Sequence, residues 1–282
     1  MKHFIVDENN VRLDIFLSRV LHCGRQFSQT LIKSGSVIPR DLSASSRLVL
    51  GFKLTVLDCS SIKKVFKNDF LLSILYEDND VLVINKPCNL LVHSYNDSGE
   101  FTLVDLLKNY QCSLSDGFLP ERPGLVHRLD KATEGLMVIA KTNVAQDHLK
   151  TQFASRTIQK GYYAFVYGKI NTDYLCIEKP LQRHGHLWRV FNQGKHAKTE
   201  VFVIKRWSTK TLLYLKPLTG RTHQLRVHLF SVGFPIIGDP FYGKVKGSGQ
   251  LLQSSYLSFV HPSTNIRYSF SIPLSTRLSQ KC

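Results

Sequence analysis

The sequence predicts an α+β fold, in which a small N-terminal module precedes a larger domain that is rich in strands. Three observations support this prediction. Strand-like runs of apolar and β-branched residues, bounded by turn residues, recur between residues 74 and 272. Amphipathic helical patterns occur at 102–110 and 143–156. Residues 11–58 combine helical spacing with one short strand, which is typical of a separate small unit.

The N-terminal module is expected over residues 1–59. Its first helix is predicted by apolar residues at helical spacing, namely Leu13, Phe16, Leu17 and Val20. A second helix is expected from Ser28 to Ile32, with Gly35 as its stop, and a strand at 53–57 completes the module. Residues 60–72 carry three lysines between apolar segments and are predicted to be a basic linker.

The larger domain is expected over residues 73–282. The turn residues at 78–80 separate two strands, and the second strand stops at Pro87. A helix is predicted from Thr222 to Gly233. Further strands are predicted by runs at 161–168, 199–207, 211–217, 256–260 and 268–272.

The charge of the chain indicates a polyanionic partner. The 282 residues contain 37 basic and 21 acidic side chains, which gives a net charge of +16. The apolar fraction of 43% excludes a mainly disordered chain. A basic excess of this size favours a nucleic acid as partner, although some basic proteins bind none.

The cysteines and the N-terminus predict a cytoplasmic protein. The six cysteines form no C-x-x-C pair and are typical of reduced thiols. Acidic residues Asp7 and Glu8 interrupt the N-terminus before a secretory apolar segment could form. The longest uncharged apolar stretch, 227–238, is too short to span a bilayer. We therefore expect no membrane association.

The stretch from Gly124 to Gly135 is the strongest candidate for a functional site. It places His127, Arg128 and Asp130 within four residues, directly before the apolar run 136–140. Charged groups on a turn beside a rigid strand are a common way to build a site. The alternative is that Asp130 caps a turn or pairs with Arg128 at the surface.

A second candidate lies between residues 218 and 230. Arg221 stands at the entrance of the predicted helix, and Arg226 follows one turn later beside apolar positions. An arginine buried at such a position needs an anionic partner. Lys86, at a strand end, could contact phosphate or be solvated, and the residues alone leave both possibilities open.

Several other chemistries lack their sequence signatures. The eleven histidines include no H-E-x-x-H motif and no cluster with cysteine, so no metal site is expected. The G-x-S-x-G motif and the kinase motifs are also absent. A carboxylate, two arginine-bearing motifs, a tyrosine-rich strand and a basic surface remain. This set fits a nucleophilic or proton-abstracting aspartate that acts on a nucleic acid.

The motifs together resemble those of the RluA/RluD-type pseudouridine synthases, the family of the ribosomal large subunit pseudouridine synthases. They occur in the family order at 82–87, 126–135, 160–164, 219–228 and 238–243. The N-terminal module resembles a degenerate alpha-L RNA-binding motif. The resemblance implies a pseudouridine synthase fold, built on a mixed, largely antiparallel sheet flanked by helices, with the alpha-L-like module before it.

The resemblance also implies catalytic roles. Asp130 matches the aspartate that attacks the sugar or removes a sugar proton. Arg226 matches the arginine that pairs with this carboxylate, and Tyr162 matches the tyrosine that stacks on the flipped base and helps to remove its proton. Arg128 matches an arginine that contacts RNA, and Leu225 is expected to pack against the uracil. The reaction is an isomerisation and needs no cofactor.

We also expect His127, Arg221 and Lys86 to contact the substrate. Glu134 departs from the family pattern, which usually has serine there, and adds a negative charge near Asp130. The predicted function is conversion of uridine to pseudouridine in structured RNA by a monomer, with ribosomal RNA of the large subunit preferred. The alternatives are a transfer-RNA synthase and a catalytically silent RNA-binding ribosome-assembly factor.

Overall fold

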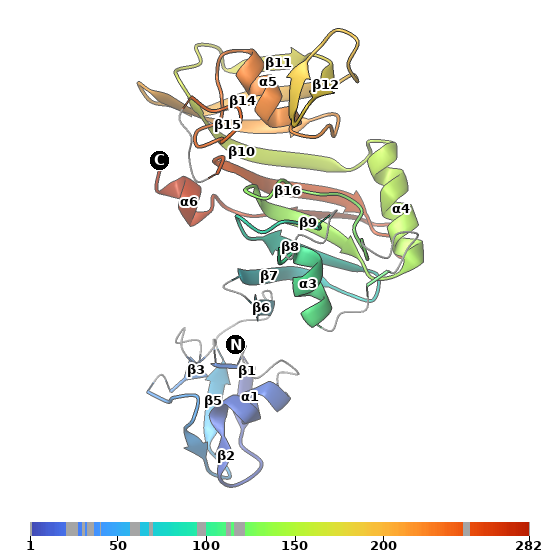
Figure 1. Cartoon of the computed structure of the whole chain (residues 1–282). Helices are drawn as coiled ribbons and strands as arrows, with labels where there is room; N and C mark the ends of the chain where they lie inside the picture. The colour runs from blue at the N-terminus through green and yellow to red at the C-terminus, as the bar shows by residue number, and fades with distance from the viewer. Residues whose placement is uncertain are drawn as a thin grey trace. The chain divides into compact units, whose positions relative to one another are not determined.

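The computed structural model of the chain describes residues 2–20, 28–29, 32, 37–39, 41–56, 63–67, 70–94, 100–110, 114–115, 122–244 and 249–281. The chain forms two compact units, Met1–Tyr76 and Glu77–Cys282 (Figure 1). None of the helices in the described ranges has the length and apolar character that a membrane span requires.

The N-terminal unit contains a small sheet and one described helix with its own core. Strands β1 (Lys2–Ile5), β5 (Lys53–Val56) and β3 (Val37–Ile38) form the sheet in that order, and β2 (Val11–Arg12) pairs with β4 (Arg47–Leu48). Helix α1 spans Leu13–Val20 and buries Leu13, Phe16 and Leu17, as its spacing predicted. Most of the predicted second helix, including Gly35, lies outside the described residues.

The stretch predicted to be a basic linker contains regular structure. Residues 63–67 form strand β6 (Lys63–Lys67), which pairs antiparallel with β7 (Phe70–Glu77). The three lysines suggested a solvated segment, whereas Val65 and Phe66 favour a strand and the apolar run after them supplies a pairing partner.

The sheet of the larger unit is mixed and largely antiparallel, as predicted. From β11 to β8 its order is β11-β14-β15-β10-β16-β9-β8, and β17 also pairs with β16. Only β16 and β9 are parallel among these described pairs. The strands are β8 (Val81–Lys86), β9 (Glu134–Ala140), β10 (Gln159–Tyr167), β11 (Tyr174–Glu178), β14 (Lys198–Arg206), β15 (Lys210–Pro217), β16 (Leu252–Val260) and β17 (Arg267–Ser271).

The central strands are covered on both faces. All residues of β8 from Val81 to Ile84 and of β9 from Leu136 to Ala140 are fully buried. Such strands show continuous apolar runs because neither face meets water. Helix α4 (Asn143–Ala154) contacts β9 and β16 (Figure 1). The N-terminus of helix α3 (Leu103–Asn109) is stabilised by a capping box between Thr102 and Asp105.

The remaining described elements of the larger unit are two helices and a hairpin. Helix α5 (Gln224–Ser231) contacts β15 and the hairpin of β12 (Leu181–His184) and β13 (Leu187–Val190). Helix α6 (Thr276–Ser279) follows the last strand. The helix predicted from Thr222 begins only at Gln224, because His223 has a φ of 55° and cannot lie within a right-handed helix.

Candidate active site

Asp130 lies in a tight turn that leads into β9. The Thr133 amide donates to the Asp130 carbonyl at 3.0 Å. Gly135 then has a φ of +117°, and a Cβ atom there would lie 2.1 Å from the Ser254 carbonyl oxygen. Only glycine therefore allows β9 to start so close to β16. The result is a carboxylate held at the start of a buried strand with 21% of its side chain exposed.

Arg226, on α5, holds this carboxylate. Its Nη1 donates to Asp130 Oδ2 at 2.8 Å. Its Nε and Nη2 donate to the two oxygens of Asp239, at 2.7 and 2.8 Å. The side chains of Arg226 and Asp239 are only 3% and 0% exposed. Because the bidentate pair fixes the plane of the guanidinium, its Nη1 group is aimed at Asp130.

The buried charges of this site compensate one another. Burial acts to lower the pKa of Arg226, but the hydrogen bonds and charges of Asp239 and Asp130 raise it overall. Burial likewise acts to raise the pKa of Asp239, and its bonds to Arg226 lower it overall. The amides of Phe241 and Tyr242 also donate to Asp239, at 2.9 and 3.1 Å. Arg226 and Asp239 therefore stay an ion pair at neutral pH.

The sequence assigned no role to Asp239 or His223. Asp239 belongs to the motif at 238–243, whose spacing does not show that it supplies the anionic partner that a buried Arg226 requires. His223 Nε2 lies 3.9 Å from Asp130 Oδ1, and its Nδ1 is 3.0 Å from the Tyr242 hydroxyl. Burial lowers the pKa of His223, against the charge of Asp130, which raises it. His223 thus lies beside the Asp130 carboxylate, and Asp239 holds the arginine that binds it.

Tyr162 lies on β10 opposite Ser254 of β16, where the register of the two strands shifts. Its side chain is largely buried and lines the same cleft as Asp130. Burial raises the pKa of Tyr162 to about 12, a hydrogen bond to Ser254 opposes this, and the charge of Asp130 adds to it. The phenol is therefore neutral at physiological pH.

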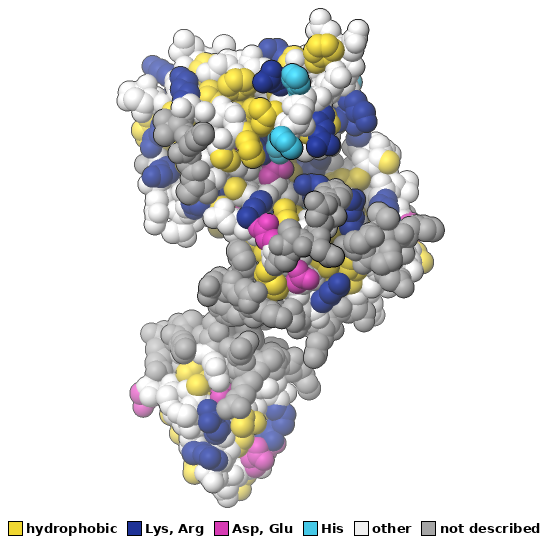
Figure 2. Space-filling model, viewed as in Figure 1, with side chains coloured by type: hydrophobic (Ala, Val, Ile, Leu, Met, Phe, Trp, Pro, Cys, Tyr) yellow, Lys and Arg dark blue, Asp and Glu magenta, His cyan; other side chains and the backbone are white. Residues whose placement is uncertain are grey.

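A cleft of about 1210 Å³ brings these residues together. It lies where β10 and β14 begin and β15 ends. Its basic lining residues are Arg128, Arg156, Lys160, Lys216, Arg221 and Arg226. Only Asp130 and Glu200 oppose them among the acidic lining residues. On the face of the larger unit seen in Figure 2, Lys and Arg side chains are also more frequent than Asp and Glu. The cleft therefore favours a polyanion.

Four of the residues predicted to bind substrate line this cleft. Arg128 is exposed, and Leu225 is 7% exposed. Arg221 is half-buried, and its Nε donates to the His196 carbonyl at 3.1 Å. His127 is the fourth. Lys160, which received no role from the sequence, also lines the cleft, and burial lowers its pKa.

His127 serves the fold as well as the cleft. Its ring stacks on Phe153 with the centroids 4.7 Å apart, and its Nε2 accepts the Val138 amide at 3.1 Å. Burial lowers the pKa of His127 to about 3, and the charge of Lys160 acts in the same direction. A neutral ring that accepts a backbone hydrogen bond fixes the loop against β9 and cannot supply a cation to RNA.

The titration of His127 predicts a loss of stability in acid. Its pKa in the folded protein, about 3, lies below the ordinary 6.5, so the unfolded chain binds the proton first. The contribution is complete above pH 6.5 and is lost as the pH falls toward 3. Relative to His127→Gln, we expect the free energy of unfolding to fall by about 2 kcal/mol between pH 8 and pH 5.

Urea denaturation followed by tryptophan fluorescence measures this difference. Both tryptophans, Trp188 and Trp207, lie in the larger unit, so the signal reports that unit. The control is His186→Gln, which removes an exposed histidine of the same unit. Parallel stability curves for wild type and His127→Gln would contradict the assignment of His127 as a neutral, half-buried acceptor.

Lys86 does not lie where a substrate contact requires it. Its side chain has no exposed surface. Its ammonium donates to the carbonyls of Pro87, Leu90 and Lys131, at 2.8, 2.8 and 3.1 Å. Burial lowers the pKa of Lys86 to about 7. A buried ammonium with all three donors engaged cannot bind phosphate, so the predicted contact is wrong, and Lys86 instead supports the turn that carries Asp130.

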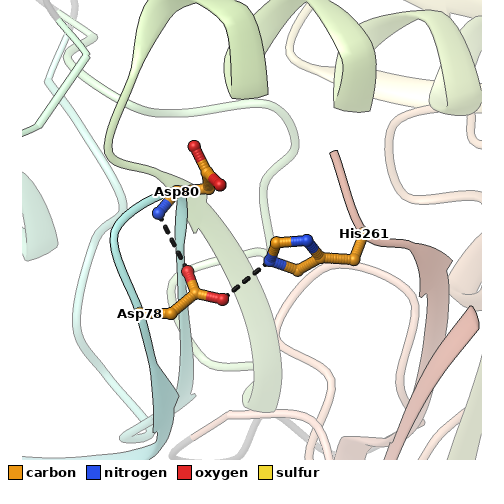
Figure 3. Close-up of side chains that lie close together, drawn as sticks. All are labelled: Asp78, Asp80 and His261. Atoms are coloured by element: carbon orange, nitrogen blue, oxygen red, sulfur yellow. Dashed lines mark hydrogen bonds and ion pairs between the residues drawn. The ribbon is translucent and has the colours of Figure 1, made fainter. Parts of the chain in front are cut away.

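One group of side chains has the composition of a metal site. Asp78, Asp80 and His261 approach one another within 4.8 Å beside the turn before β8 (Figure 3). Asp78 accepts from the amides of Asp80 and Val81, at 2.9 and 2.8 Å, and lies 2.7 Å from His261 Nε2. His261 Nδ1 accepts two further amides at 3.3 and 3.2 Å. The Asp78 oxygen and the His261 nitrogen thus accept backbone amides of their own turns, and the cluster gives no support for a bound ion.

The fold and the cleft define an enzyme site that acts on a polyanion. A family model described as RNA pseudouridylate synthase matches residues 80–231. An uncharacterized RNA pseudouridine synthase of Aquifex aeolicus is 37% identical over 92% of this chain and 89% of its own. The ribosomal large subunit pseudouridine synthase D of Borreliella burgdorferi is 36% identical over 88% of this chain and 80% of its own. The chain belongs to the RNA pseudouridine synthase family.

The similarity extends to solved structures. Human RNA pseudouridylate synthase domain containing 1 superimposes with a TM-score of 0.61 and 26% identity, over 73% of this chain and 86% of that one. Human RNA pseudouridylate synthase domain containing 4 superimposes with a TM-score of 0.57 and 23% identity, over 73% of this chain and 90% of that one. This second likeness shows the shared fold. The predicted fold class is confirmed. The protein is an isomerase that converts uridine in RNA to pseudouridine.

Proposed function

We propose that this enzyme modifies uridines of large-subunit ribosomal RNA and that Asp130 carries the reaction. The observation that supports the catalytic assignment best is the Asp130 carboxylate, held by buried Arg226 in a basic cleft beside Tyr162. Several relatives that cover most of this chain bear the name of ribosomal large subunit synthase D, among them the Borreliella burgdorferi protein. The alternative substrate is transfer RNA.

Two first steps are compatible with a carboxylate at this position. In one, Asp130 attacks C1′ of the ribose, and the bond from C1′ to N1 breaks so that the uracil leaves with the electron pair. In the other, Asp130 takes a proton from C2′ and the same bond breaks. The uracil then turns and its C5 bonds to C1′. In the first route this breaks the bond from Asp130 to C1′, and in the second Asp130 returns the proton to C2′. C5 finally loses its proton while N1 gains one. Arg226 keeps the carboxylate oriented for either step.

Tyr162 and Leu225 are proposed to hold the uracil while it turns. Both line the cleft, and both are mostly buried. An aromatic face stacks on a flipped base and stabilises it outside the helix. A phenol whose pKa is raised to about 12 is a poor proton acceptor at neutral pH. We therefore assign Tyr162 to stacking and orientation, and not to proton removal.

Cations of the cleft are proposed to hold the RNA backbone. Arg128, Arg221 and Lys160 line the cleft together with Asp130. Extruding a base costs a few kcal/mol, so loops and distorted helices are preferred targets. The N-terminal module, residues 1–59, is proposed to add RNA contacts as an alpha-L-like domain. We also propose that the enzyme acts in the cytoplasm as a monomer.

Release of tritium from RNA labelled at uracil C5 tests this function directly. Ribosomal and transfer RNA are offered to the wild-type enzyme in parallel. Release from ribosomal RNA alone is the expected result, and release from transfer RNA alone would replace the proposed substrate. Tight binding without release from either RNA would favour the silent assembly factor.

The basic cleft also predicts a steep effect of salt on RNA binding. Each phosphate that a lysine or arginine neutralises releases a counterion, so affinity falls as salt rises. With roughly six contacts to single-stranded RNA, we expect affinity to fall roughly 300-fold between 50 and 200 mM salt. Filter binding at several salt concentrations measures the slope. A flat profile would contradict binding through the backbone.

A further inference from the structure

The turn that carries Asp130 is anchored through both of its central carbonyl groups. The Lys131 carbonyl accepts the Lys86 ammonium at 3.1 Å. The Ala132 carbonyl accepts Cys88 Sγ at 3.2 Å and Arg277 Nη2 at 3.4 Å. A peptide group bonded in this way cannot rotate without losing those bonds. The backbone that carries Asp130 is therefore held by groups outside the cleft, while Arg226 holds the carboxylate within it.

Arg277 is the donor that joins this turn to a second segment of the chain. Besides Ala132, its guanidinium donates to the carbonyls of Gln250 and Gly249, at 2.8 and 3.4 Å. Gln250 in turn donates from Nε2 to the Thr133 hydroxyl at 2.9 Å. The rigid, planar guanidinium can hold several acceptors at once, which an ammonium on a flexible stem cannot do in the same geometry.

Glu134 is the charge partner of Arg277. Arg277 Nε lies 3.1 Å from Glu134 Oε1, and the same oxygen accepts the Ser275 hydroxyl at 2.8 Å. Ser275 is also the N-cap of α6, so the short helix that presents Arg277 is tied to β9. The side chains of Arg277 and Glu134 are 27% and 13% exposed. Neither residue lines the cleft, so the pair acts on the site through the turn.

We propose that Arg277 and Glu134 are positioning residues, which set the orientation of Asp130 without contacting RNA. This inference rests on the proposed catalytic role of Asp130. Its physical basis is that a carboxylate displaced by about 1 Å can lose about 10²-fold in rate. The pair thus links the segment after β17 to the chemistry in the cleft.

Single-turnover tritium release at saturating RNA, together with RNA affinity, tests the pair. Arg277→Ala should lower the single-turnover rate about 10-fold, while the dissociation constant for RNA changes less than twofold. Arg277→Lys keeps the charge but loses the planar fork, so we expect an intermediate rate. Glu134→Ala should lower the rate less than Arg277→Ala does. The double variant should be no slower than Arg277→Ala, because both act through one turn.

Lys281→Ala is the matched control, since it removes one exposed cation from the same segment and should leave rate and affinity unchanged. An unchanged rate in Arg277→Ala with a lower melting temperature would overturn the inference, because the pair would then only stabilise the fold. A loss confined to RNA affinity would overturn it as well. If Arg277→Ala does not fold, Arg277→Lys and Glu134→Ala decide by the same criteria. An inactive wild type would instead overturn the proposed function.

Discussion

Asp130→Asn should abolish tritium release while the protein still binds RNA. The amide can neither attack C1′ nor accept a proton, so we expect the rate to fall by about 10³-fold or more. The turn that holds residue 130 should persist, because the donors that anchor its Lys131 and Ala132 carbonyls are left in place. Removing a negative charge from a basic cleft should leave RNA affinity equal to that of the wild type or slightly higher. The rate at saturating RNA and filter binding measure the two effects.

Asp147→Asn is the matched control for this variant. Asp147 is an exposed carboxylate on α4 outside the cleft, so its replacement removes the same charge and should leave activity unchanged. Substantial activity in Asp130→Asn would exclude both proposed first steps. A large loss of RNA affinity would show that Asp130 organises binding and not the chemical step.

Arg226→Met should be both inactive and strongly destabilised. The substitution leaves the fully buried Asp239 without its cation and removes three hydrogen bonds. Breaking a buried ion pair in this way costs about 3–5 kcal/mol. For a unit of this size we expect the melting temperature to fall by about 10 °C. Tryptophan fluorescence during heating measures it, and tritium release measures activity.

Adding Asp239→Asn to Arg226→Met separates the two effects. The asparagine is neutral, yet its oxygen can still accept the amides of Phe241 and Tyr242. We therefore expect the double variant to recover much of the lost stability while it stays inactive, because Asp130 still lacks its guanidinium. A double variant that regains activity would show that Arg226 serves only to neutralise Asp239.

The sequence predicted the local elements well because their signals are local. The apolar runs of β8 and β9 and the helical spacing of α1 and α4 each depend on a few neighbouring residues. Helix α4 begins at Asn143, where its helical pattern begins, and its N-cap is Thr142. The sheet order and the single described parallel pair were not predictable from spacing, because they depend on residues about a hundred positions apart.

The site was predicted in its chemistry and only partly in its geometry. The motifs identified Asp130, Tyr162 and Arg226, and the structure places all three at one cleft. They did not show that Lys86 is buried, because a lysine at a strand end looks the same whether it binds phosphate or carbonyl oxygens. They also gave Asp239 no role, since only the fold brings it to Arg226.

The pairing of β9 with β16 has a consequence for synthesis on the ribosome. Asp130 precedes β9, but its guanidinium partner lies 96 residues later, and the parallel neighbour of β9 begins only at Leu252. A growing chain therefore presents the carboxylate long before Arg226, Asp239 and β16 have emerged. The active site can therefore assemble only late in synthesis. An incomplete chain can expose a basic surface to RNA but cannot yet modify a uridine.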